Sequence, residues 1–170
     1  MGHLAHRAMR KDEADSIARE WCVELYATPD SKVFEGDVSD TRFSNPVAYH
    51  IAQTSQDVVG YLFSNERDPE VPESVDDLCR LIALQEARPS EAFASFFKLR
   101  SIVFSRAGKS GMDAKTLSVV NDRIDACLLR AMDCYTRFRE QIMQLRIDEL
   151  KRSRGAFEGR YNAARVQVGA

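Results

Sequence analysis

Apolar residues recur along 117–151 at spacings that alternate between four and three residues. The stripe consists of Ile124, Leu128, Ala131, Tyr135, Phe138, Ile142 and Leu145. This is the a/d pattern of a heptad helix, and neither proline nor glycine interrupts it between Met112 and Arg154. It predicts one helix of roughly 50 to 60 Å, which is longer than a compact domain of this size is wide. We therefore expect the charged end of the helix, before Gly155, to project from the body.

The stripe has two interpretations, which apply to different halves of the helix. Its first half is typical of the core face of a central helix in an all-α domain. Its second half, over 138–150, is suited to pairing with a second copy of the chain, which buries a stripe that extends past its own domain. The residues that we predict at this dimer or partner interface are Tyr135, Phe138, Arg139, Ile142, Leu145 and Arg146. The two arginines would be flanking charges that select the partner helix.

Shorter apolar patterns at helical spacing precede the long helix. They predict helices over 11–27, 46–62, 74–87 and 89–107. Asn45 is suited to cap the second of these helices, with Pro46 in its first turn, and the polar segment 31–44 predicts a loop. The helix over 89–107 is the most aromatic, and we expect it to be buried on more than one side.

Length and composition fit one soluble domain. The chain has 170 residues, of which 44% are hydrophobic and 29% charged, with a formal net charge of -2. We expect an all-α, globin-like bundle over 1–154 and a disordered tail over 155–170. The charge balance gives no sign of a nucleic-acid or membrane partner. No apolar run is long enough to span a bilayer, and 1–11 lacks a signal-peptide core, so we expect a cytoplasmic protein.

The four cysteines, Cys22, Cys79, Cys127 and Cys134, show no C-x-x-C spacing. Cys127 and Cys134 would lie about 10 Å apart along one helix, which is too far for a disulfide. We interpret all four as small, reduced core residues and predict no metal site.

The sequence carries little that points to catalysis. It has no glycine-rich phosphate loop, no H-E-x-x-H and no G-x-S-x-G motif. Glu86, Glu91, Asp122 and Asp125 lie on polar faces, where a solvated surface is the ordinary interpretation. We therefore predict no enzyme and no catalytic residue. A small helical enzyme with a site shared between subunits is the weakest alternative.

His50 is the ionisable residue of most interest, because the pattern places it on the apolar face of the helix over 46–62. Such a histidine is usually a core or boundary residue bonded to a backbone carbonyl. The alternative is an imidazole that ligates haem iron, which would make the chain a globin-type gas or redox sensor. We expect no cofactor, and we keep His50 as the ligand residue if haem is bound.

Several short motifs occur together in a specific order and spacing. They are Trp21, Phe43-x-Asn45-Pro46-Val47, Arg80-x-x-Ala83-x-Gln85, Pro89-Ser90-x-Ala92 and Asp133-x-Tyr135-x-x-x-Arg139-Glu140-x-Ile142-x-x-Leu145-Arg146-x-x-Glu149-x-Lys151. With these motifs the chain resembles, over 16–152, the N-terminal domain of the RsbRD-type RsbT co-antagonists, relatives of the bacterial stressosome proteins.

The resemblance implies a globin-like sensory domain that normally binds no haem and forms dimers. In such proteins the last helix continues into a phosphorylatable STAS output domain. No STAS segment follows in this sequence, so no phospho-acceptor can be carried over. We therefore expect a non-catalytic signalling module that acts as a homodimer and docks an unknown protein partner on its paired long helices.

Overall fold

The computed structural model describes residues 9–26, 46–85 and 88–168, and this part of the chain forms five helices. They are α1 (Lys11–Tyr26), α2 (Pro46–Leu62), α3 (Ser74–Leu84), α4 (Pro89–Ser110) and α5 (Ala114–Val168). The all-α fold with a long C-terminal helix is thus confirmed. The loop predicted over 31–44 and the predicted cap Asn45 lie outside the described residues.

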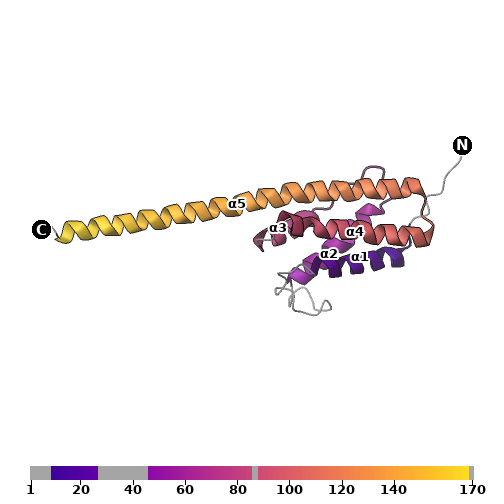
Figure 1. Ribbon diagram of the computed structural model, residues 1–170, viewed down its shortest axis with the longest axis horizontal. Coiled ribbons are helices and arrows are strands. Elements are labelled where there is room, and N and C mark those ends of the chain that lie inside the picture. Colours follow the sequence, from indigo (N-terminus) through magenta and orange to yellow (C-terminus); the bar gives the residue numbers. More distant parts are fainter. Residues whose placement is uncertain (1–8, 27–45, 86–87, 169–170) are drawn as a thin grey trace.

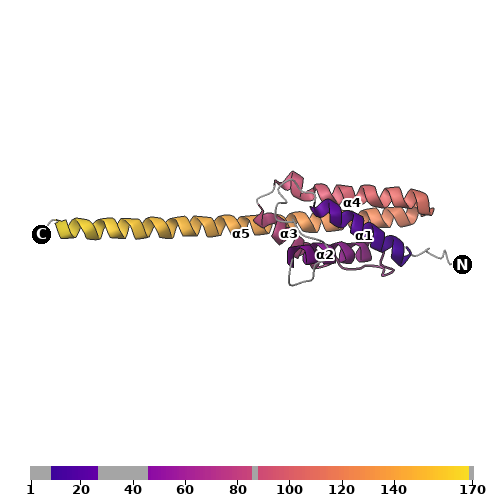
Figure 2. The same ribbon diagram turned by 90° about the horizontal axis from the view of Figure 1, so that it is seen from below.

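Four short helices form a body along the first half of α5. In Figure 1 the rest of α5 extends alone to the C-terminal end, and Figure 2 shows the same arrangement from a perpendicular direction. At 1.5 Å per residue, α5 is about 80 Å long. The first half of α5 is therefore the central helix of the body. Its second half projects beyond the body, and we call this projecting part the rod.

Local sequence signals explain where α4 and α5 begin and end. Pro89 occupies the first turn of α4, and the Glu91 carboxylate accepts a hydrogen bond from the Arg88 backbone N–H at 3.2 Å. Gly111 ends α4 with a φ of 68°, a left-handed conformation that glycine adopts without strain. The Asp113 Oδ1 atom then accepts a hydrogen bond from the Thr116 N–H at 2.9 Å, which caps the start of α5.

The end of α5 differs from the sequence prediction. We expected Gly155 to stop the helix, but the helix continues to Val168. A glycine inside a helix costs only about 1 kcal/mol relative to alanine, and no proline follows it here. Helical residues on both sides are enough to continue the helix through that position.

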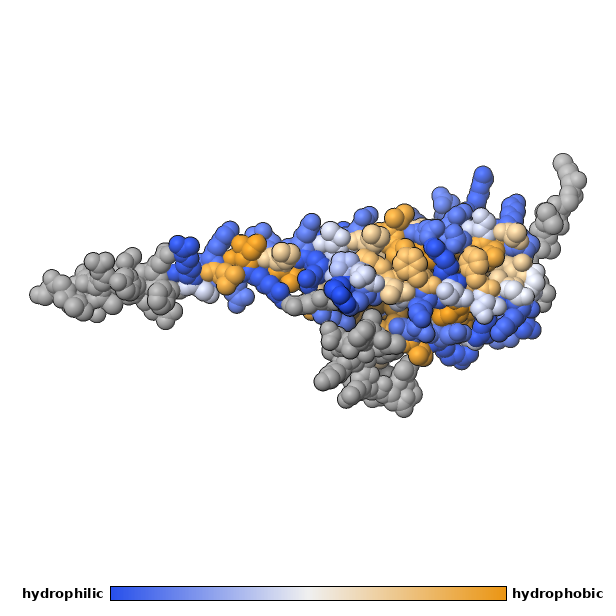
Figure 3. Space-filling model, viewed as in Figure 1, coloured by the Kyte–Doolittle hydropathy of each residue, from blue (hydrophilic) through white to orange (hydrophobic). Residues whose placement is uncertain are grey.

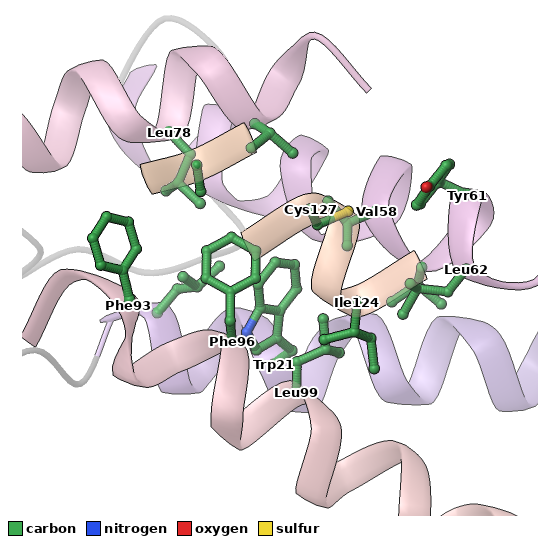
Figure 4. Packing of buried hydrophobic residues seen from close by; sticks show 14 of the residues in the cluster. Trp21, Val58, Tyr61, Leu62, Leu78, Phe93, Phe96, Leu99, Ile124 and Cys127 are labelled. Atoms are coloured by element: carbon green, nitrogen blue, oxygen red, sulfur yellow. The ribbon is translucent and has the colours of Figure 1, made fainter. Parts of the chain in front are cut away.

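The core lies between α5 and the four shorter helices. Figure 4 shows Trp21 and Phe96 at its centre, with Leu99, Val58 and Ile124 around them. The Trp21 and Phe96 rings pack edge to face with centroids 5.6 Å apart. The indole Nε1–H of Trp21 donates a hydrogen bond to the Ser95 carbonyl oxygen at 2.8 Å. This bond satisfies the one polar group of a fully buried side chain.

Candidate interaction surface on the long helix

The stripe predicted on α5 begins as core, since Ile124, Ala131 and Tyr135 are buried and Leu128 is half-buried. Other residues of α5 are buried in the body beside them, namely Val120, Cys127 and Cys134. Tyr135 was predicted at the interface, but the structure places its ring inside its own protomer. The ring packs edge to face on Phe93, with centroids 5.4 Å apart. Its role in this structure is to hold α4 against α5.

Phe138 and Arg139 lie where α5 passes the end of α3. The Phe138 ring is half-buried, and the Arg80 and Arg137 guanidinium carbons lie 4.9 and 5.3 Å from its centroid. Arg139 Nη1 donates a hydrogen bond to the Ala83 carbonyl oxygen at 3.4 Å. That carbonyl belongs to the last turn of α3, where backbone acceptors lack helical partners. Both predicted interface residues therefore contact α3 of their own chain.

The stripe leaves the body between Ile142 and Leu145. Ile142 is half-buried and packs against the core, whereas the Leu145 side chain is 68% exposed. Arg146 is also exposed. Of the six residues predicted at an interface, Leu145 and Arg146 thus lie on the rod, and the other four touch the body.

A second set of exposed apolar residues on the rod escaped the sequence analysis. Met143 is 56% exposed and Leu150 is 70% exposed, and Ile147 lies between them on the same helix. Their spacing of four and three residues is itself a heptad signal. We missed it because the longer stripe from Ile124 to Leu145 shares the segment. Figure 3 shows orange, apolar atoms among blue ones on the coloured part of the rod.

Asp76 on α3 joins the body to α5 through several polar contacts. Its Oδ1 and Oδ2 atoms accept hydrogen bonds from Arg130 Nε at 2.8 Å and Arg130 Nη2 at 2.9 Å. The Cys134 thiol donates to Oδ1 at 3.0 Å, and Arg137 Nη2 lies 3.7 Å from Oδ2. The hydrogen bonds from Arg130, more than any other cause, hold the pKa of the Asp76 carboxyl below its ordinary value.

A hollow of about 230 Å³ lies at the other end of the body, between the end of α2 and the start of α5. Arg123 forms one wall and directs its guanidinium at four backbone carbonyl oxygens. Its Nη1 atom donates to Tyr61, Leu62 and Ser64 at 3.1, 3.0 and 2.8 Å, and its Nη2 atom donates to Glu66 at 2.8 Å. These carbonyls belong to the last turn of α2 and to the loop after it, so Arg123 acts as a helix cap.

His50 lies on the exposed side of α2, not on its apolar face as we had interpreted the sequence. Its ring centroid is 5.9 Å from that of Tyr49, another exposed residue. The imidazole therefore does not point into the helical core, where a haem would have to sit. The centre of that core is filled by side chains, Trp21 and Phe96 among them (Figure 4).

The acidic residues that the sequence analysis assigned to solvated surfaces are not gathered into one site, since Glu91 lies on α4 and Asp122 and Asp125 lie on α5. Glu91 pairs with Arg88 at the start of α4, and Asp125 on α5 pairs with Arg100 of α4. Asp122 is exposed, and Glu86 lies outside the described residues. In the part of the chain that the structure describes, no three His, Cys, Asp or Glu side chains are grouped as a metal site would require.

All four cysteines are free and buried, as the sequence predicted for core residues. Burial raises the pKa of the Cys79 and Cys127 thiols to about 12. Burial is also the largest cause of the raised pKa of Cys22 and Cys134. Thiols of this kind stay protonated at neutral pH and are poor nucleophiles.

The described residues define an all-α domain with a projecting C-terminal helix. Among their helices, none combines the length and apolar character needed to cross a membrane. The family model for the RsbT co-antagonist protein rsbRD N-terminal domain matches residues 15–150. The chain belongs to this family, as its motifs suggested, and the role that the family implies is regulatory. Comparisons with curated proteins and with solved structures gave no match.

Proposed function

We propose that this chain is a non-catalytic sensor module that works as a homodimer and docks a protein partner on its paired α5 helices. The family supports this proposal, since its description names co-antagonists of a protein, RsbT. Regulation of that kind requires contact with another protein. The site of contact would be the rod, because the rod is the part of α5 that the body leaves uncovered.

The observation that carries the proposal is the exposure of apolar side chains beyond the body. Leu145, Leu150 and Met143 are each more than half exposed, and they lie on the part of α5 that no other described element covers. Burying a leucine removes about 2 kcal/mol of unfavourable hydration. A helix that presents such residues at heptad spacing reduces this exposure by pairing with a similar helix.

The same helix connects the rod to the sensory body. Ile124 and Tyr135 of α5 are core residues, and Arg130 binds Asp76 of α3 directly. A ligand or partner that changed how α3 packs would therefore displace or rotate α5. Such a signal needs two states of the body that the ligand binds with different affinity.

Light scattering on the purified protein tests the dimer directly. We expect a mass of about twice 19.2 kDa at micromolar concentration. Leu150→Asp places a charge among the exposed apolar residues of the rod and should give monomer. Gln141→Asp is the matched control, because Gln141 is exposed but lies on a different side of α5. Wild-type protein at 19.2 kDa under these conditions would contradict the proposal.

A further inference from the structure

The hollow beside the end of α2 is built from segments that lie far apart in sequence. Leu62 and Phe63 come from the end of α2, Met112 from the turn before α5, and Val119 and Val120 from the first turns of α5. These side chains give the hollow apolar walls. Val119 is 37% exposed whereas Val120 is buried, so the hollow opens at the surface and ends at the core. A molecule held there would contact the end of α2 and the start of α5 at the same time.

The hollow has the size of a small organic molecule. Its volume is about 230 Å³. An engineered protein cavity of about 150 Å³ binds benzene, which has about six non-hydrogen atoms. In proportion, the hollow has room for about nine non-hydrogen atoms. It is therefore too small for haem or a nucleotide, and it suits a single ring with a short substituent.

Two arginines line the hollow, and neither forms an ion pair with a carboxylate of the described residues. Arg123 donates through Nη1 and Nη2 to neutral backbone carbonyl oxygens, so these bonds leave its positive charge without a counter-charge. Its Nε–H takes no part in the four bonds and can donate to a further acceptor. The other arginine, Arg67, has an exposed side chain. Guanidinium groups in this state favour a carboxylate as a partner.

Carboxylates of the chain also lie near the hollow. Glu66 lines it, and Asp68 and Asp122 line a shallower depression beside it. All three residues are exposed, so water and salt screen their charges. Arg123 is half-buried, with its guanidinium carbon 5.8 Å from the centroid of the buried Tyr61 ring, and its charge is screened less. The charge that acts inside the hollow is therefore positive.

From these features we propose that the hollow binds a small carboxylic acid in its ionised form, with an aromatic or compact aliphatic body. The apolar body would displace water from Leu62, Phe63 and Val119, and the carboxylate would accept hydrogen bonds from Arg123 and Arg67. The inference rests on the sensor role proposed above and names the class of ligand that the body senses. Because Arg123 also holds the carbonyl oxygens at the end of α2, a bound acid would act directly on the contact between α2 and α5.

A titration followed by the backbone amide resonances of ¹⁵N-labelled protein tests the site. The probes are benzoate, which matches the hollow in size, and benzamide, which has the same shape without the charge. We expect benzoate to shift resonances within 61–67 and 112–123 with a dissociation constant of about 1 mM or lower. Benzamide should bind at least about tenfold more weakly, because it cannot form charged hydrogen bonds with the arginines.

Equal affinity for the two probes would overturn the assignment of an acid. No shift in those segments with benzoate up to about 10 mM would overturn the site itself. Either result would leave the homodimer intact, since light scattering tests that proposal separately.

Two substitutions with matched controls locate the binding. Val119→Trp fills the hollow and should abolish the benzoate shifts, whereas Val23→Trp, at an exposed valine of α1, should not. Arg67→Gln should weaken benzoate binding by about threefold or more and leave benzamide binding unchanged. Arg19→Gln removes the same charge from an exposed site on α1 and should have no effect. Circular dichroism would show that the variants keep their helices, and wild-type affinity for benzoate in Val119→Trp would exclude the hollow as the binding site.

Discussion

Arg130 on α5 grips Asp76 on α3 with two parallel hydrogen bonds, Nε to Oδ1 at 2.8 Å and Nη2 to Oδ2 at 2.9 Å. The planar guanidinium matches the carboxylate, so the pair fixes direction as well as distance. The Asp76 side chain is only 22% exposed, so solvent screens the interaction incompletely. The pair thus fixes the position of α3 relative to α5.

Asp76→Asn is expected to lower the free energy of unfolding by about 1 to 2 kcal/mol, because a charged hydrogen-bond acceptor is lost at a partly buried site. Urea denaturation followed by circular dichroism measures the change. Glu20→Gln is the control, since Glu20 pairs with Arg106 at 2.8 Å but both side chains are well exposed. Its effect should stay within about 0.5 kcal/mol. Equal effects of the two substitutions would contradict the special role of Asp76.

The same pair predicts a pH dependence. The folded-state pKa of Asp76 lies below its ordinary value of 3.8, chiefly because of the hydrogen bonds from Arg130. A lowered folded-state pKa means that the stabilisation is complete above the ordinary value and is lost as pH falls through the folded-state value. The stability difference between wild type and Asp76→Asn should therefore be constant near neutral pH and shrink in acid. Unfolding measured from neutral pH down to about pH 3 would show it, and a difference that grew in acid would be inconsistent.

The buried thiols predict slow chemical modification. The pKa of Cys79 and of Cys127 is raised to about 12, so little thiolate exists at pH 8 even before access is considered. We expect an aromatic disulfide reagent to label none of the four cysteines in the native protein within minutes. In denaturant it should label all four. Rapid labelling of the native chain would mean that α3 and α5 separate readily.

Several helix starts could be predicted from local chemistry alone. Proline in the first turn marked the starts of α2 and α4, and an uninterrupted heptad pattern marked α5, whereas the predicted end of α4 at 107 falls three residues before the observed end at Ser110. The confirmed parts of the fold are those where the backbone conformation favours a particular type of residue, such as proline in the first turn of a helix. The C-terminal end of α5 shows the limit of such predictions. A glycine such as Gly155 can end a helix but does not have to, and here the helix continues past it.

The surface was harder to predict, because an apolar pattern does not say which neighbour covers it. We expected α4 to be buried on several sides, yet Phe97 and Phe104 point outward. His50 followed the apolar spacing of α2 but lies on its exposed side. Likewise, Phe138 and Ile142 fit a dimer stripe, but Arg80 of α3 lies over the Phe138 ring and Ile142 packs against the core of its own chain. Such assignments depend on contacts between helices far apart in sequence.

Trp21 provides a test of the core. Trp21→Phe removes the hydrogen bond to the Ser95 carbonyl and leaves a gap beside Phe96. We expect a loss of about 1 to 3 kcal/mol in the free energy of unfolding, combining the lost bond and the lost packing. Circular dichroism must be used, since Trp21 is the only tryptophan. In wild type its fluorescence should be blue-shifted and move to the red on unfolding, and a red-shifted native spectrum would mean an exposed indole.

Arg123 tests whether a single side chain secures the end of α2. Its guanidinium donates to four carbonyl oxygens between Tyr61 and Glu66. Arg123→Lys keeps the charge, but one ammonium group cannot reach all four acceptors in that geometry. We expect a loss of about 1 to 2 kcal/mol in the free energy of unfolding, and at least as much for Arg123→Met.

Arg106→Lys is the matched control for that substitution. In the described part of the structure, Arg106 forms an ion pair with the exposed side chain of Glu20. It should change the free energy of unfolding by no more than about 0.5 kcal/mol. Hydrogen exchange of the backbone amides around 59–66 would locate the effect, with faster exchange expected in Arg123→Lys. Arg123→Lys could instead preserve both the free energy of unfolding and the slow exchange of these amides. In that case charge alone would hold the end of α2, and the directed hydrogen bonds of the guanidinium would be dispensable.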